Sequence, residues 1–353
     1  MTSRPTVSVL VPTYNYARFL PEAIESVLAQ DFTDFELLIS DDCSTDGSAE
    51  VLRHYAGRDP RIQVRCQPSN LGMVQNWNWC LQQARGRYIK FLFGDDCLAT
   101  RHALGRMATV LEKDEGVGLV ASARHIIDER SQVVDLWSHV GAPGIHWGRG
   151  VVRRCLFYNK NLIGEPSVVM FRNGNVRRGF DTNYRQVVDL EMWCHILARS
   201  ELAYIDEPLC QFRLHSQQQT VINQKSRIGE MEFVTLLHRY MPDCVTAVAP
   251  ITSKERNYLF YFIYNIQKRP SMPAEMREFA KVFRTQLGSG WYAAYLARHR
   301  FCRPFANLCH AWEKHVMPAG LYGGKPSYGV RRRPISRVPF PEVTVHPPRA
   351  CPL

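Results

Sequence analysis

The sequence predicts an α/β protein with a mixed, mainly parallel sheet flanked by helices and a C-terminal helical extension. Two observations predict this fold class. Between residues 6 and 92, apolar runs of strand length alternate with segments whose apolar side chains recur at helical spacing. Polar loops follow the strand-like runs, and two of these loops carry paired aspartates. Such alternation builds βαβ units, in which neighbouring strands run parallel.

The first three strand–helix pairs can be placed from this periodicity. The predicted strands are 7–11, 35–40 and 62–66, and the predicted helices are 18–30, 48–56 and 73–84. The turn at Thr45-Asp46-Gly47-Ser48 supplies N-cap side chains for the second helix. The second strand ends at the pair Asp41-Asp42.

A fourth predicted strand, residues 88–93, ends at Asp95 and Asp96. In open α/β sheets, ligands bind at the carboxyl ends of the strands. Carboxylates at such a place suit Mg²⁺ or Mn²⁺, which proteins bind through one or two carboxylates plus substrate phosphates. An isolated Asp-Asp pair also fits a polar turn, so its interpretation depends on the other strand ends.

Beyond residue 100 the pattern becomes mixed. A strand is expected at 117–121, a helix at 189–199 and mostly helix over 226–315. After Gly323 the chain is rich in proline and arginine, which is typical of a disordered tail. The predicted organisation is a catalytic domain over 1–222, a helical region over 223–322 and a tail over 323–353.

Composition narrows the class of protein. The chain has 353 residues, 45% hydrophobic and 22% charged, as in soluble globular proteins. The N-terminus resembles no signal peptide, and the run 258–264 is too short to span a bilayer. The 11 cysteines include no CxxC pair, which favours reduced thiols and a cytoplasmic location.

The positive charge is concentrated at the C-terminal end. Residues 271–353 hold 13 Lys and Arg against 4 Asp and Glu, a net charge of +9 out of the chain's +11. A basic end can face nucleic acid, anionic lipid or an anionic polymer. No nucleic-acid-binding motif accompanies it, so no nucleic acid partner is expected. Residues 258–266 with Arg298, Arg300 and Arg303 could instead lie on an anionic membrane, giving a peripheral location on its inner face, or cap the catalytic domain with a solvated basic face.

The strand ends favour a nucleotide held through metal. A carboxylate after the second strand could accept hydrogen bonds from a base or a ribose. The first loop lacks GxGxxG, and the chain contains no GxxxxGK[ST], which argues against a dinucleotide site and a P-loop. A nucleotidyltransferase would need a Gly-rich basic loop after the first strand, which is absent.

Four segments taken together resemble family 2 glycosyltransferases of the GT-A fold. They are VSVLVPTYNYARFLPEAIESVLAQ, LLISDDCSTDGS, NLGMVQNWN and GRYIKFLFGDD, in that order. The resemblance covers roughly residues 5–220. It implies sugar transfer from a nucleotide-sugar, with inversion at the anomeric carbon, to a glycan or lipid-linked glycan.

The resemblance implies roles on the donor side. The segment Pro12, Thr13, Tyr14 and Asn15 would pack on the base and ribose of a UDP- or dTDP-sugar, and Asp42 would accept the N3–H of uracil or thymine. Asn70, Gly72 and Asn76 would shape the nucleotide edge. Asp95 would place the donor sugar. Asp96 and His215 would bind Mn²⁺ or Mg²⁺, with Arg213 in support. Phe93 stands where the family often has an aspartate, so one carboxylate fewer is expected near the metal.

The resemblance also implies roles on the acceptor side. Asp189 matches the family's general base, although Val188 replaces the usual glutamate before it; an acidic residue that favours a helix N-terminus is the plainer interpretation. Glu191 is the alternative base on this side. Glu165 could bind an acceptor hydroxyl or pair with a nearby arginine. A non-catalytic module that binds nucleotide-sugar or glycan is the competing functional hypothesis, supported by Phe93 and Val188.

Overall fold

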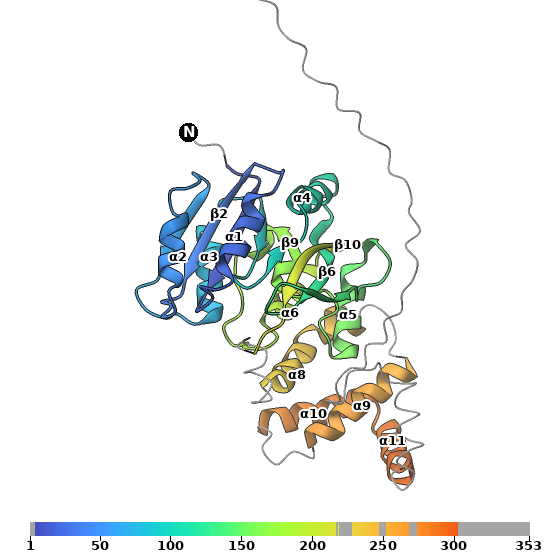
Figure 1. The fold of residues 1–353 in the computed structure, drawn as a ribbon. Coiled ribbons are helices and arrows are strands. Elements are labelled where there is room, and N and C mark those ends of the chain that lie inside the picture. The colour runs from blue at the N-terminus through green and yellow to red at the C-terminus, as the bar shows by residue number, and fades with distance from the viewer. Residues whose placement is uncertain (1–3, 217, 219–227, 247–251, 268–273, 303–353) are drawn as a thin grey trace, which may run out of the picture. The chain divides into compact units, whose positions relative to one another are not determined.

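The computed structural model describes residues 4–216, 218, 228–246, 252–267 and 274–302 (Figure 1). Ten strands of these residues form one mixed sheet in the order β3-β2-β1-β4-β9-β6-β10-β5, with β7 paired to β6 and β8 to β10. The strands are β1 (Val7–Thr13), β2 (Phe35–Asp41), β3 (Ile62–Cys66), β4 (Tyr88–Phe91), β5 (Cys97–Leu98), β6 (Val117–Ile127), β7 (Val133–Trp137), β8 (Gly144–His146), β9 (Val169–Arg172) and β10 (Glu201–Arg213). The predicted mixed α/β sheet is therefore confirmed.

The N-terminal half of the sheet is parallel, and its strands β1, β2 and β4 are buried. β1 lies between β2 and β4, and every residue of the three strands is buried. Strands buried on both faces are expected to be continuous apolar runs, as this sequence has. The register pairs Thr13 with Asp41, and the Asp42 N–H donates to the Thr13 carbonyl at 2.9 Å. The loops after β1 and β2 consequently begin side by side at one edge.

The second half of the sheet is joined through β9, which runs antiparallel to both β4 and β6. The long strands β6 and β10 pair in parallel, and β10 continues until its residues pair with β5, just after Asp95 and Asp96. This path returns the chain to the edge where β4 ends. It brings Arg213 and His215 close to the two aspartates, which precede them by more than 100 residues.

Helices cover the sheet. They are α1 (Leu20–Leu28), α2 (Ser48–Tyr55), α3 (Met73–Gln83), α4 (Ala103–Lys113), α5 (Gly148–Tyr158) and α6 (Val188–Leu197), with 3-10 turns η1 (Pro166–Val168) and η2 (Asn173–Val176). α3 packs on β1 and β2, while α4 packs on β6 and β9. The predicted helices at 18–30, 48–56, 73–84 and 189–199 are confirmed to within a few residues at their ends.

The C-terminal region is helical wherever the structure describes it. α8 (Ile228–Tyr240), the π-helical turn η3 (Met241–Thr246), α9 (Ser253–Gln267), α10 (Ala274–Leu287) and α11 (Ser289–Cys302) follow the sheet. One compact unit extends to Pro304, so the predicted boundary at residue 222 falls inside it. The proposed tail over 323–353 lies outside the described residues, as does Arg303, and nothing is described of the Arg298 and Arg300 side chains. Across the described part of the chain, no helix combines the length and apolarity needed to cross a membrane.

Candidate active site

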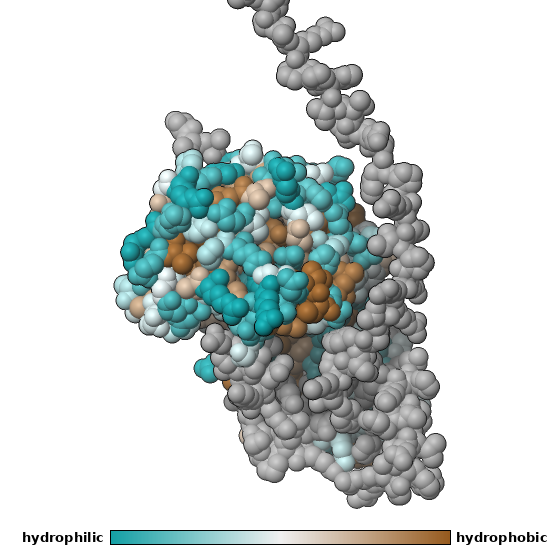
Figure 2. Space-filling view, viewed as in Figure 1, coloured by the Kyte–Doolittle hydropathy of each residue, from teal (hydrophilic) through white to brown (hydrophobic). Residues whose placement is uncertain are grey.

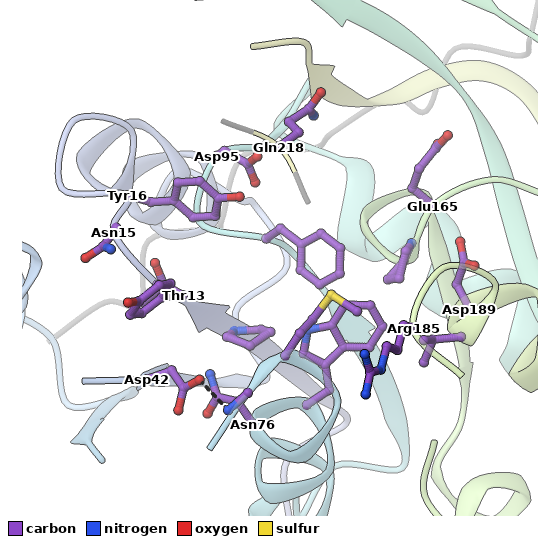
Figure 3. Close-up of a pocket in the computed structure, with 18 of the residues that line it drawn as sticks. Thr13, Asn15, Tyr16, Asp42, Asn76, Asp95, Glu165, Arg185, Asp189 and Gln218 are labelled. Carbon is purple, nitrogen blue, oxygen red and sulfur yellow. Dashed lines mark hydrogen bonds between the residues drawn. The ribbon is translucent and has the colours of Figure 1, made fainter. Parts of the chain in front are cut away.

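A pocket of about 540 Å³ lies at the carboxyl ends of β1, β2 and β4 (Figure 3). Eleven of the predicted site residues line it: Pro12, Thr13, Tyr14, Asn15, Asp42, Asn70, Gly72, Asn76, Asp95, Glu165 and Asp189. The other lining residues are Tyr16, Met73, Trp77, Phe93, Pro166, Arg185, Gln186, Val188, Phe212 and Gln218. In Figure 3, Asp42 and Asp189 lie at opposite ends of this pocket, with Asp95 and Tyr16 along a third side.

Asp42 organises the loop that forms one end of the pocket. Its two carboxylate oxygens accept the backbone N–H groups of Leu71 and Gly72 at 2.7 and 2.9 Å, and the Asn70 amide donates to its carbonyl at 3.0 Å. Gly72 has φ +84°, a conformation that a side chain disfavours. Asp42 therefore holds residues 70–72 in place while lining the pocket itself.

The loops after β1 and β2 are also tied to each other. Asn15, at φ +57°, accepts the Thr45 N–H on its side-chain oxygen at 2.8 Å and donates its own N–H to the Ser44 hydroxyl at 2.8 Å. Asn76 exchanges hydrogen bonds with the hydroxyl and carbonyl of Ser40 at 2.6 and 3.1 Å, so most of its polar capacity is used within the protein. These contacts make this end of the pocket a prearranged surface.

Unlike these side chains, Thr13 at the same end of the pocket has a polar group without a hydrogen-bond partner among the described residues. Its hydroxyl is buried and has no hydrogen-bond partner among the described groups, although Thr13 lines the pocket. A Cβ on Gly94 would lie 2.7 Å from this hydroxyl, so only glycine lets the Asp95 turn approach so closely. A buried hydroxyl without a partner is rare in proteins and is readily explained by a ligand that would bind it.

The paired aspartates after β4 have different environments. Asp95 lines the pocket, whereas Asp96 is fully buried behind it and accepts the Arg213 backbone N–H at 2.9 Å. Burial, and next the charge of Asp95, raise the pKa of the Asp96 carboxyl well above its usual value. Asp95 thus lines the pocket and Asp96 lies behind it, with the Asp96 Oδ2 atom buried and without a hydrogen-bond partner among the described residues.

His215 and Tyr16 surround the Asp95 carboxylate. His215 Nε2 lies 2.9 Å from Asp95 Oδ2, and its ring packs edge-on against Tyr16 with centroids 5.7 Å apart. Burial, and next the charges of Asp95 and Asp96, raise the pKa of the Tyr16 hydroxyl. Tyr16 was not predicted as a site residue, although it directly follows the predicted loop 12–15.

Asp95 and His215 form a donor set that suits a divalent cation. A carboxylate oxygen and an imidazole nitrogen face each other beside the pocket, and Mn²⁺ accepts both ligand types. Among the described residues, no group of three or more His, Cys, Asp or Glu side chains is arranged around a common metal position. Substrate phosphate oxygens would then have to supply the remaining ligands, as is usual for Mg²⁺ sites.

Asp189 forms the opposite end of the pocket. Its Oδ2 accepts the Asn161 amide at 2.9 Å, and its Oδ1 accepts the Leu190 N–H at 2.7 Å. Burial, followed by the charge of Glu165, raises the pKa of Asp189 to about 7, while these two hydrogen bonds limit the rise. A carboxyl group poised near neutral pH can exchange a proton, which is the property of a general base.

Glu165 both lines the pocket and pairs with an arginine. Its carboxylate lies 2.8 Å from Arg124 Nε, and the Arg124 side chain is buried. The arginine-pair alternative for Glu165 is therefore confirmed. The pair also places a second negative charge near Asp189.

Glu191 is not part of the pocket, which corrects its prediction as an acceptor-side residue or alternative base. It is 0% exposed and accepts hydrogen bonds from Arg178 at 2.6 Å and from the Tyr240 hydroxyl at 2.8 Å. Arg239 lies 3.2 Å from the same carboxylate. Its role is to join α6 to α8.

An aromatic surface separates the two ends of the pocket. Trp77 and Phe93 stack with centroids 4.9 Å apart and planes 29° apart, and both line the pocket. Position 93, where the family often has an aspartate, supplies an apolar face here. Gln218, shortly after the end of β10, also lines the pocket.

Curated relatives of the chain are glycosyltransferases or lack an assigned activity. An uncharacterized glycosyltransferase of Haemophilus influenzae is 28% identical over 62% of this chain and 68% of its own length. A Mycobacterium tuberculosis protein named MT1568 is 28% identical over 59% of this chain and 66% of its own. TuaG of Bacillus subtilis, which its name places provisionally in teichuronic acid biosynthesis, is 41% identical over 26% of this chain and 37% of its own. The chain thus spans between about a third and two thirds of these relatives.

A solved structure supports the fold assignment. Staphylococcus aureus TarS, residues 1–349 in complex with UDP-GlcNAc, aligns over 76% of this chain and 82% of its own with a TM-score of 0.52 and 17% identity. At this identity the likeness concerns the fold. The family model described as Glycosyl transferase family 2 matches residues 8–174, which contain both loops of the Asp42 end and the Asp95 turn. Over these residues, the chain is similar to glycosyl transferase family 2.

Proposed function

We propose that this protein is an inverting glycosyltransferase that moves a sugar from a UDP- or dTDP-sugar to a hydroxyl of a glycan or lipid-linked glycan. One observation carries the proposal: a carboxylate with a pKa of about 7, Asp189, lies at the end of the pocket opposite the nucleotide-binding surface around Asp42 (Figure 3). A single displacement needs this arrangement, with the base on the face opposite the leaving group.

The donor half of the proposal rests on Asp42 and Thr13. The Asp42 oxygens, each bound to one backbone N–H, keep lone pairs for the N3–H of a pyrimidine. The Thr13 hydroxyl offers a further hydrogen bond. The TarS structure that shares this fold was solved with UDP-GlcNAc, which supports a uridine donor.

Asp95 and His215 would hold a divalent cation, Mn²⁺ or Mg²⁺. When bound, it would neutralise charge on the diphosphate of the donor. The protein's own residues complete the arrangement. Tyr16 would hold the His215 ring in place by edge-on packing, and Trp77 and Phe93 would exclude water from the space between donor and acceptor, where hydrolysis competes with transfer.

At the other end, Asp189 would take the proton of the acceptor hydroxyl. The acceptor oxygen forms its bond to the anomeric carbon as the bond from that carbon to the diphosphate oxygen breaks. The nucleoside diphosphate leaves with the electron pair. Asn161 would orient the carboxylate. Because attack comes from the face opposite the leaving group, the anomeric configuration inverts.

The acceptor and the location are proposed from one relative and from the charge of the C-terminal region. The teichuronic acid relative favours a polysaccharide acceptor. The basic C-terminal region favours an anionic membrane surface facing the cytoplasm, where lipid-linked glycans would be presented. Flotation of the full chain with anionic vesicles at low salt tests the membrane part, and absence of binding would remove it.

The decisive experiment measures nucleoside diphosphate release from UDP-, dTDP- and GDP-sugars with Mn²⁺ or Mg²⁺, for wild type and Asp189→Asn. We expect metal-dependent release with one pyrimidine donor. Its rate should rise with pH to a plateau above about 7, because the protonated carboxyl cannot act as base. Asp189→Asn should lower the rate ~10²- to 10⁴-fold. Donor binding by calorimetry without turnover, even with crude glycan acceptors, would instead identify a binding module.

A further inference from the structure

Helix α8, which follows the segment matched by the family model, reaches the loop that leads into the proposed base. We infer that Glu232 on this helix is a positioning residue that sets residues 185–187 and thereby the start of α6 at Asp189. The inference rests on the proposed function for its kinetic consequences, but its structural consequence can be measured without turnover.

Glu232 makes three hydrogen bonds to consecutive backbone groups. Its Oε1 accepts the Arg185 N–H at 2.6 Å, and its Oε2 accepts the N–H groups of Gln186 and Val187 at 2.7 and 3.0 Å. The glutamate is 8% exposed. A buried carboxylate that accepts three amide hydrogens fixes the backbone on which those amides lie, because releasing any of them would leave a buried charge less satisfied.

The loop needs such a partner because the N-cap residue of α6 cannot cap the helix. This residue is Val187, whose side chain makes no capping hydrogen bond. The negative charge of Glu232 lies next to this N-terminus, where an anion stabilises the helix. Glu232 accepts the N–H of the N-cap residue Val187, a group that a glutamate within the first turn accepts in a capping box, from a position 45 residues along the chain.

The segment held in this way carries pocket residues. Arg185 and Gln186 line the pocket, and Val188 and Asp189 follow directly. A displacement of the loop would therefore move the Asp189 carboxylate relative to the donor. Misplacement by about 1 Å can cost a reaction ~10²-fold.

A second contact between α8 and the loop is independent of charge. A Cβ on Gly229 would lie 2.8 Å from Gln186 Cγ, so the first turn of α8 packs on this side chain without room for a methyl group. Gly229→Ala should stabilise the helix by up to ~1 kcal/mol while pushing against Gln186. This variant therefore distinguishes an effect on the position of the loop from an effect on stability. If α8 only stabilised the fold, Gly229→Ala would leave kcat unchanged and keep or raise Tm.

The test compares wild type with Glu232→Gln and Gly229→Ala, using Glu278→Gln as a matched control. Glu278 is an exposed glutamate of α10 paired with Lys281. Hydrogen exchange of the backbone amides of 185–187 is measured first on each full chain, with no substrate. Glu232→Gln should raise their exchange at least ~10-fold, because one amide oxygen cannot replace two carboxylate oxygens. Unchanged protection in Glu232→Gln would overturn the inference.

Kinetics with the donor found for the wild type form the second measurement. Both variants should lower kcat ~10- to 100-fold with the donor KM within a factor of two, since the Asp42 end is not touched. Gly229→Ala should lower kcat without lowering Tm. Wild-type kcat in Gly229→Ala, or an equal loss in Glu278→Gln, would overturn the inference. A wild type without turnover would contradict the proposed function alone, because the exchange measurement would still decide the role of Glu232.

Discussion

Arg213 holds Asp96 through its backbone: its N–H donates to the Asp96 carboxylate at 2.9 Å, while its guanidinium donates to the Asp95 carbonyl at 2.7 Å. The same guanidinium donates to Glu22 at 2.6 Å and to the Asp128 carbonyl at 2.9 Å, and it lies 4.6 Å from the centre of the Phe19 ring. The arginine is fully buried. One side chain therefore joins the aspartate turn to α1 and to the end of β6.

Arg213→Lys is expected to destabilise the fold although the charge is kept. A lysine ammonium cannot reproduce the planar arrangement of donors that contacts three segments at once. We expect the free energy of unfolding to fall by ~3 kcal/mol, as for a broken buried ion pair, with a matching fall in Tm. The exposed arginine Arg53, paired with Glu50, is the control, and Arg53→Lys should leave Tm unchanged. Equal melting of the two variants would contradict the role given to Arg213.

The free energy of unfolding of Asp189→Asn, relative to that of wild type, is expected to increase as the pH rises. Burial raises the pKa of Asp189 to about 7, above its value in the unfolded chain, so the folded state binds this proton more tightly. Stability contributed by the group is therefore complete below pH ~4 and is lost as the pH rises to about 7. The variant, which has no carboxyl to ionise, should gain free energy of unfolding over wild type from pH 5 to pH 7 and level off above. Urea unfolding at pH 5, 6, 7 and 8 measures this difference, and a constant difference would contradict the raised pKa.

Substitution of Asp95 and substitution of Asp96 should affect the metal dependence of nucleoside diphosphate binding differently. Asp95→Asn and His215→Ala are expected to lose the Mn²⁺-dependent part of nucleoside diphosphate binding, because both side chains belong to the proposed cation site. Asp96→Asn should keep it within a factor of a few, since Asp96 lies behind the pocket and an asparagine oxygen can still accept the Arg213 N–H. Calorimetric titration with and without EDTA gives the readout. Loss of metal dependence in Asp96→Asn alone would restore the assignment of the metal to Asp96.

Asp42→Asn should weaken donor binding more than it slows catalysis. The carboxylate accepts two backbone N–H groups, and hydrogen bonds to a charged acceptor contribute ~1.5–3 kcal/mol each, so losing one would raise the donor KM ~10-fold or more. The effect on kcat should be smaller, because Asp189 and Asp95 are unchanged. Asp59→Asn, at a surface ion pair with Arg61, controls for loss of charge. Steady-state kinetics that show a lower kcat at unchanged KM would contradict the nucleotide role.

The sequence predicted which residues lie together at the carboxyl ends of the first strands, because that information is local. Each of Thr13, Asp42 and Asp95 follows a strand that can be recognised from its own apolar run, and parallel strands bring those ends together. The division of roles between Asp95 and Asp96 was not predictable in this way. It depends on which of two adjacent carboxylates meets the backbone of Arg213, more than 100 residues later.

The acceptor half was predicted less completely for the same reason. Asp189 was identified through family resemblance, but Glu191, two positions along the same helix, turned inward because Arg178 and Tyr240 surround it. Helical periodicity cannot say which partners a helix will meet. Trp77 shows the reverse case, since this largely buried tryptophan of α3 also has a face on the pocket.

The burial of Glu191 also determines where the folding unit can end. Its carboxylate has no access to water and depends on Tyr240 and Arg239, both near the end of α8. A polypeptide ending at residue 222 would keep the charge and lose two of its three partners, at a cost of several kcal/mol. The smallest autonomous fragment should therefore extend through Tyr240. Gene fusions or domain exchanges that join another acceptor module to this nucleotide-binding half would have to retain α8 or replace Glu191 at the same time.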